Sequence, residues 1–178
     1  MKIPRPAPDE HAEYYSRYID RVRATDVLRE LEDQVDRVCD VVGAFGDEGA
    51  KHRYAEGKWS VKDIVGHLTD SERVFTYRAT AFARSDTTSL PGMDENAWVA
   101  AANFDAVPLD ALLDEFAAVR AASVLLFRNL SPAELARQGV GNGRPMSVRA
   151  VPWLIVGHTD HHLGVIEDRY RLPGPDHS

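Results

Sequence analysis

The sequence has 178 residues, with 21 basic and 28 acidic side chains, and its formal net charge at neutral pH is −7. Phosphate binding needs a concentrated positive face. The basic residues here are scattered along the chain, so we expect no nucleic-acid partner. A chain of this length can bury a core of its own, and we treat residues 1–178 as one domain.

The composition also indicates the cellular compartment in which the protein works. Cys39 is the only cysteine, which excludes an intramolecular disulfide and fits a reducing environment. No apolar run approaches the roughly 20 residues of a membrane span. The N-terminal residues lack the apolar core of a signal peptide. We therefore expect a cytoplasmic protein without a membrane partner.

The first predicted elements are an extended arm over residues 1–8 and a short helix. Pro4, Pro6 and Pro8 fix φ and remove backbone donors, which favours the arm, and Asp9 is expected to cap the helix. The first long helix is predicted from Asp26 to the glycines at 43 and 46. Its apolar residues recur in steps of three and four, as in a helical bundle: Leu28, Leu31, Val35, Val38, Val42 and Phe45.

Ser60 and Asp63 predict the start of the second long helix, because they form an aspartate variant of the capping box. We expect this helix to end near residue 85. His67 lies within it, one turn from Ile64 and Ser71, and can therefore face the core.

Residues 87–107 form a long connection with a predicted short helix from Asp94. Such a connection either covers a site or only crosses the end of a bundle, and the pattern leaves both open. The third long helix is predicted from Pro108 to residue 130, and Ser131 caps a further turn. Residues 139–143 are glycine-rich but lack a phosphate-binding pattern, so we predict a loop.

The last predicted helix covers residues 148–170, with Ser147 as its cap. Pro152 predicts either a kink or a later start. Steps of three and four connect the residues of its inward face: Val148, Val151, Ile155, His158, His162, Val165 and Arg169. His158 and His162 thus occupy core positions on one face, whereas His161 lies on the flank and is interpreted as a bystander. A flexible tail is expected at residues 173–178.

Four amphipathic helices without a sheet predict an all-α four-helix bundle with short extra helices. Two inward imidazoles are either satisfied core residues or half of a metal site, and a metal would compensate for their desolvation. If the second and fourth long helices are neighbours, His67 meets His158 and His162. Three neutral imidazoles suit a divalent ion and leave coordination positions open, as in catalytic sites. Trp59, Trp98 and Trp153 are assigned to core or interface.

The chain resembles the DinB-like superfamily over nearly its whole length. The matching segments are Lys58-Trp59-Ser60-Val61-Lys62-Asp63, Gly66-His67-Leu68, Leu90-Pro91-Gly92-Met93-Asp94, Ser147-Val148-Arg149-Ala150 and Gly157-His158 with His161-His162. The resemblance implies a four-helix bundle, often paired as a homodimer, with a zinc or nickel ion held by one histidine of the second helix and two of the fourth. These carry over to His67, His158 and His162. Pro152 is a departure that affects only the start of the last helix.

The resemblance also implies a chemistry, because characterised relatives include metal-dependent enzymes that use a thiol such as bacillithiol or mycothiol. Our leading hypothesis is that the metal binds this thiol as a thiolate, whose sulfur attacks an electrophilic small molecule. No side chain is assigned as catalytic. The alternative is a hydrolase with a metal-bound water, in which Asp70 or Glu72 acts as base unless both are surface carboxylates. A stress-related metal-binding protein without turnover is the third interpretation.

Overall fold

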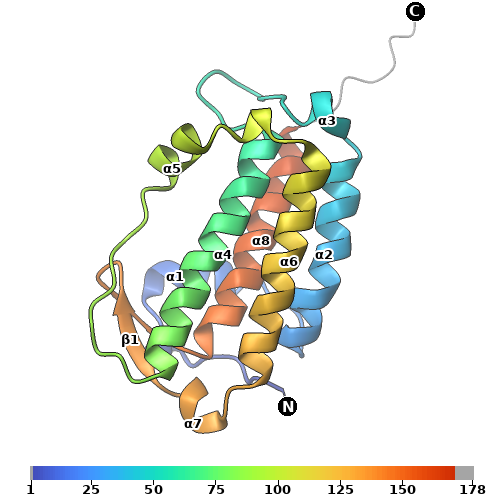
Figure 1. Ribbon diagram of the computed structural model, residues 1–178. Helices are drawn as coiled ribbons and strands as arrows, with labels where there is room; N and C mark the ends of the chain where they lie inside the picture. Colours follow the sequence, from blue (N-terminus) through green and yellow to red (C-terminus); the bar gives the residue numbers. More distant parts are fainter. Residues whose placement is uncertain (1, 171–178) are drawn as a thin grey trace, which may run out of the picture.

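Four long helices form the body of the protein in a computed structural model that describes residues 2–170. They are α2 (Val27–Gly43), α4 (Val61–Ala83), α6 (Leu109–Arg128) and α8 (Ala150–Arg169), and they run side by side (Figure 1). The predicted four-helix bundle is therefore confirmed. The expected tail at residues 173–178 lies outside the described residues.

The long helices pack as a closed ring. Helix α4 packs against α6, α6 against α2, α2 against α8, and α8 against α4. Helices α2 and α4, which follow each other in the chain, thus occupy opposite corners of the bundle. This arrangement makes α4 and α8 neighbours, the condition on which the predicted histidine site depends.

Capping residues set the starts of the long helices. The Asp26 side chain accepts a hydrogen bond from the backbone N–H of Arg29 at the start of α2. Ser60 and Asp63 form the predicted capping box of α4, with both reciprocal hydrogen bonds at 2.9 Å. Helix α8 begins only at Ala150, so Pro152 lies in the first turn, where a missing N–H breaks no helical hydrogen bond.

The core is divided by a polar layer, defined here as the buried residues Gln34, His67, Ser71, Glu72, Arg120, His158 and Thr159. One apolar cluster lies on one side of it and includes Leu31, Val124 and Ile155. The other lies on the opposite side and includes Val38, Phe116 and Leu163. Along α2, α6 and α8 the apolar face is thus interrupted at the same height by polar side chains. Apolar burial on both sides is the main favourable contribution to folding.

Shorter elements lie at the ends and along the side of the bundle. They are η1 (Pro8–Glu10), α1 (Glu13–Ile19), α3 (Gly46–Gly49), α5 (Glu95–Ala102), η2 (Phe104–Ala106) and α7 (Pro132–Leu135). Asp9 lies inside η1 and does not cap α1, which follows Ala12, so that prediction was wrong. Asp94 caps α5 as predicted, through a hydrogen bond from the backbone N–H of Ala97. No helix within residues 2–170 has the length and apolar character needed to cross a bilayer.

A two-stranded hairpin replaces the loop predicted at residues 139–143. Strand β1 (Gln138–Gly141) pairs antiparallel with β2 (Arg144–Ser147). Asn142 and Gly143 at its tip have φ of 55° and 67°, the left-handed backbone of a two-residue hairpin turn. Leu90 of the long connection exchanges backbone hydrogen bonds with this hairpin, through Val140 O at 2.9 Å and Asn142 N at 3.0 Å. The hairpin and the connection therefore form one wall at the side of the bundle (Figure 1).

Candidate metal centre

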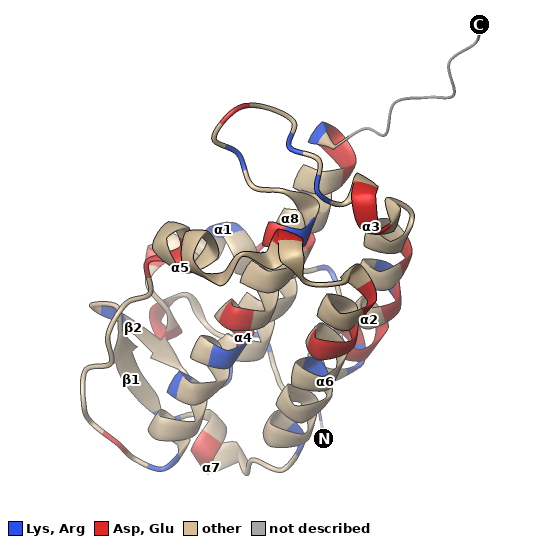
Figure 2. Cartoon of the chain, turned by 45° about the horizontal axis from the view of Figure 1, so that its top comes forward, with Lys and Arg blue, Asp and Glu red and all other residues tan. Residues whose placement is uncertain are grey.

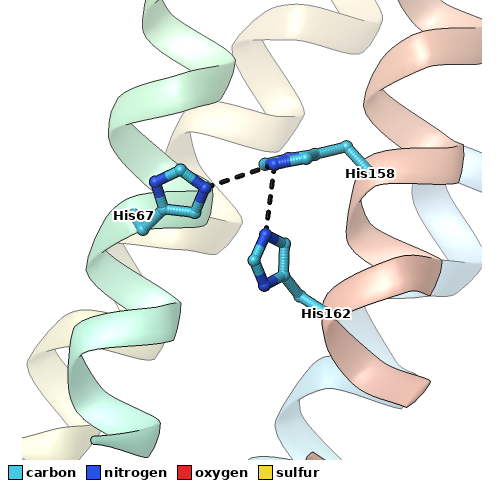
Figure 3. Close-up of side chains that lie close together, drawn as sticks. All are labelled: His67, His158 and His162. Carbon is cyan, nitrogen blue, oxygen red and sulfur yellow. Dashed lines mark hydrogen bonds between the residues drawn. The ribbon is translucent and has the colours of Figure 1, made fainter. Parts of the chain in front are cut away.

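Three histidines converge between α4 and α8. His67 projects from α4, His158 and His162 project from successive turns of α8, and the rings point toward one another (Figure 3). Nε2 of His158 lies 3.2 Å from Nε2 of His67 and 3.2 Å from Nε2 of His162. The structure thus brings together the three residues selected from the sequence.

A glycine precedes His67 and another precedes His158, and each allows a neighbouring segment to pack closely against the helix. A Cβ at position 66 would lie 2.4 Å from the ring of Phe104, and one at position 157 would lie 2.0 Å from the backbone oxygen of Tyr18. Phe104 therefore packs directly on α4, and α1 packs directly on α8. Both contacts bury the helix surface immediately beside a histidine.

Burial keeps the three imidazoles neutral at pH 7. It lowers the pKa of His67 to about 4. It lowers the pKa of His162 to about 3, with smaller contributions from His67 and His161. The pKa of the buried His158 also falls well below its usual value, first because of burial and then because of the neighbouring histidines. Neutral imidazole is the form that binds metal ions.

Hydrogen bonding among these rings cannot satisfy all of them. A neutral imidazole nitrogen carries either one hydrogen or one lone pair. Nε2 of His158 faces two other nitrogens at hydrogen-bond distance, so only one of the two contacts can be a hydrogen bond. Nitrogens bound to a tetrahedral zinc ion at 2.0–2.1 Å lie about 3.3 Å apart. The donor set and its spacing therefore fit a divalent ion.

Aromatic rings surround the histidines. The Trp59 ring lies 4.7 Å from the ring of His67 and is stacked near His162, with 6.3 Å between centroids and 18° between planes. Our assignment of Trp59 away from the site was wrong. The assignment of Trp153 to the core is confirmed, since it is buried and its indole N–H bonds to Pro4 O. Trp98 is 46 % exposed.

An open cavity of about 200 Å³ leads to the histidines. Met93 and Glu95 line it, so the long connection covers the site and is more than a crossover. His161 also lines the cavity but is not among the converging ligands. The sequence analysis missed the cavity-lining side chains Tyr14, Arg17 and Tyr18 of α1, Arg78 of α4, and Arg144 of β2. No local pattern identifies them, because they come from three elements that lie far apart in the sequence.

The two carboxylates considered as bases lie outside the cavity. Asp70 pairs with Arg73 at 3.3 Å near the surface. Glu72 accepts two hydrogen bonds of 2.9 Å from Nε of Arg120 inside the bundle. It follows His67 by five residues, which turns it about 140° around the helix. Asp70 thus fits the alternative of a surface carboxylate, whereas Glu72 is buried in an ion pair, and neither is positioned to act as a base at the histidines.

Comparisons with known proteins agree with this architecture. The sequence model of the DinB superfamily matches residues 30–166. A protein from Oceanobacillus iheyensis with the name "Putative metal-dependent hydrolase" is 23% identical over 142 residues, which cover 79% of this chain and 81% of that protein. The structure of YfiT from Bacillus subtilis is described as "a probable metal-dependent hydrolase with an unusual four-helix bundle topology". It superposes with a TM-score of 0.66 at 21% identity and covers 92% of this chain and 89% of its own, a likeness in fold.

Proposed function

The chain belongs to the DinB superfamily, and from this premise we propose that it is a divalent-metal-dependent enzyme whose ion is held by His67, His158 and His162. The observation that carries the proposal is the convergence of three imidazole nitrogens in an open cavity, two from the buried His67 and His158 and one from the half-buried His162. Nε2 of His158 lies 3.2 Å from each of the other two. The names of the two relatives, both metal-dependent hydrolases, support it. An all-imidazole set suits zinc or nickel, and three protein ligands leave room for a reactant.

The surroundings of the three histidines keep the imidazoles unprotonated and limit the movement of their rings. Burial keeps the imidazole lone pairs free of protons at neutral pH. Ser71 Oγ lies 3.4 Å from Nδ1 of His67 and limits rotation of that ring. Trp59 and Phe75 pack against the imidazoles and also line the cavity that leads to them. When bound, the ion supplies Lewis acidity that lowers the pKa of a thiol or a water molecule.

For the reaction, we propose transfer of a low-molecular-weight thiol to an electrophilic small molecule. Glu95 is the only carboxylate among the described residues that line the cavity, and it is solvent-exposed. A thiol has an ordinary pKa of about 8.5, against about 15.7 for water, so it needs less help from a side-chain base. The sulfur then bonds to the electrophilic carbon, the leaving group departs with its electron pair, and the thiol proton goes to solvent.

Hydrolysis is the second candidate, and the names of the two relatives favour it. In that reaction Glu95 is the carboxylate that could accept a proton from water, because it lines the cavity whereas Asp70 and Glu72 do not. The two candidates differ in one requirement, which is the need for an added thiol.

The first experiment is elemental analysis of the purified protein, of His158→Ala and of His161→Ala. We expect about one equivalent of metal in the wild type and in His161→Ala, and none in His158→Ala. Absence of metal from the wild type, even after incubation with zinc and nickel, would overturn the proposal.

The second experiment separates the reactions. Metal-loaded protein is incubated with 1-chloro-2,4-dinitrobenzene and a panel of thiols, and separately with 4-nitrophenyl acetate without thiol. Thiol-dependent consumption that His158→Ala loses supports transfer. Thiol-independent hydrolysis that the same variant loses supports the second candidate. Metal-loaded protein without either activity, against a wider panel of electrophiles and esters, contradicts the catalytic proposal.

A further inference from the structure

Three arginines share the cavity with the histidines: Arg17 of α1, Arg78 of α4 and Arg144 of β2. They come from three elements that meet only in the folded protein. The chain as a whole is acidic, and its acidic residues gather along α2 and α3 (Figure 2). The cavity therefore has a charge opposite to that of the protein.

These arginines lack the partners that other arginines of the chain have. Arg73, Arg120 and Arg149 each lie within 4.0 Å of a carboxylate. Within residues 2–170, no carboxylate lies within that distance of the three cavity arginines. Glu95 lines the same cavity but lies beyond ion-pair distance, so none of the three charges has a counterion in contact with it within residues 2–170.

Arg78 is the most deeply buried of the three, with 4% of its surface exposed. Its one side-chain hydrogen bond within the described residues runs from Nη2 to Pro91 O at 2.7 Å. A guanidinium has five N–H donors, so most of its capacity is left for the cavity. A Cβ at position 141 would lie 2.8 Å from Cδ of Arg78, so the hairpin backbone presses on its stem and holds the group in place.

Arg17 and Arg144 lie over the same aromatic ring. Their guanidinium carbons are 4.0 Å and 3.9 Å from the centroid of Tyr14. Arg17 also donates a hydrogen bond of 2.9 Å to the hydroxyl of Tyr18, whose ring contacts His158. Tyr15 lines the same cavity as Arg78 and Arg144, and both charges oppose the rise of its pKa that burial causes. The three cations are therefore grouped around the tyrosines of α1.

We infer that Arg17, Arg78 and Arg144 bind an oxyanion group, a carboxylate or a phosphate, of the molecule that reacts at the histidines. Like charges gathered without counterions raise the local positive potential, and an anion relieves their repulsion. Guanidinium groups match carboxylate and phosphate oxygens through paired hydrogen bonds. Because the same cavity reaches His67, His158 and His162, a bound anion positions the rest of the molecule beside them. This assignment of substrate class rests on the proposed function, whereas the anion site itself does not.

The test uses the full chain after metal removal with a chelator, so that binding to a metal ion cannot contribute. Inorganic phosphate and succinate are titrated separately by calorimetry at constant ionic strength, against wild type, Arg144→Gln and Arg17→Gln. Arg84→Gln is the matched control, because it removes an exposed arginine that directly follows α4 and pairs with Glu134 away from the cavity. Using both Arg144→Gln and Arg17→Gln covers the case in which one of them fails to fold.

We expect the dissociation constant of the preferred anion to rise at least tenfold in Arg144→Gln and Arg17→Gln and to stay within twofold in Arg84→Gln. The anion that binds more tightly to the wild type identifies the group as carboxylate or phosphate. The inference is overturned if neither anion binds the wild type, or if Arg84→Gln loses as much affinity as the cavity variants. Metal content of Arg144→Gln, measured in parallel, is expected to equal that of the wild type. Loss of anion binding with full metal content therefore separates this site from the metal site.

Discussion

Two clusters of polar side chains lie side by side within the bundle, and only one of them has all its hydrogen-bonding groups paired. In the Arg120 cluster, formed by Gln34, Glu72, Arg120 and Thr159, each long helix contributes one residue. The guanidinium donates to both Glu72 oxygens at 2.9 Å, to Gln34 Oε1 at 3.0 Å and to Thr159 Oγ1 at 3.1 Å. The buried charges are paired, and the donors have acceptors.

The histidine cluster, formed by the buried His67 and His158 and the half-buried His162, lies nearer the surface and is not fully hydrogen-bonded. Three neutral nitrogens face one another, and their contacts cannot all be hydrogen bonds. The comparison teaches that burial alone does not distinguish a structural polar cluster from a ligand site. A ligand site is distinguished by nitrogen or oxygen atoms that converge on one point and lack hydrogen-bond partners there.

The largest effect is expected from removing the carboxylate of the Arg120 cluster. Glu72→Ala leaves the Arg120 charge buried without its counterion, and we expect the free energy of unfolding to fall by about 3–5 kcal/mol. Urea denaturation followed by circular dichroism measures this loss. Metal content of the folded fraction is expected to stay at the wild-type value. A loss below about 1 kcal/mol, the range of surface pairs, would show that the cluster does not act as a buried ion pair.

The next largest effect is expected from the binding of a metal ion to the histidine cluster. Zinc added to metal-free protein is expected to stabilise it by about 2.7 kcal/mol when free zinc is at 100 times its dissociation constant. His67→Ala removes a ligand and should abolish the gain, whereas His161→Ala should keep it. Thermal denaturation with and without zinc measures both. Equal stabilisation of both variants would contradict the assignment of the ligands.

Lowering the pH should reduce the folding stability of the metal-free protein through the same histidines. The pKa of His67 is about 4 in the folded protein and about 6.5 in an unfolded chain. Between these values the unfolded chain binds more protons, so stability falls as the pH falls from 6.5 toward 4, by up to about 1.4 kcal/mol per pH unit for each such group. His67→Gln should flatten this dependence, as measured by urea denaturation across the range. An unchanged slope would refute the expected neutral burial.

The smallest effect is expected outside both clusters. Asp70→Asn removes a partner of Arg73, which keeps Glu115 at 2.6 Å. We expect a change in unfolding free energy within about 0.5 kcal/mol, as for most surface substitutions. Metal content and turnover should also remain unchanged. A large loss of turnover with full metal content would restore a chemical role for Asp70.

The sequence predicted the histidine cluster better than the Arg120 cluster. His67, His158 and His162 could be selected because helical spacing determines which side chains share a face. Arg120 could not, since an arginine is typical of the surface, and only its partners on the other helices make its burial on the apolar face of α6 possible. Glu72 had the character of a surface carboxylate for the same reason.

The hairpin and the cavity wall show a second limit. Asn142-Gly143 is a strong turn signal, but each flanking strand has only four residues, with glycine or proline among them, too few for an alternating pattern. Trp59 and the cavity arginines are placed by contacts between distant segments. Local propensity carries no information about such contacts.

The polar layer also determines how the helices align along their length. An apolar face with a repeat of about seven residues allows one helix to slide past its neighbours by two turns and still bury leucine and valine. Such a slide would move Arg120 away from Glu72 and into one of the apolar clusters, at a cost of several kcal/mol. Only one longitudinal alignment therefore keeps this ion pair, and that alignment also places His67 level with His158.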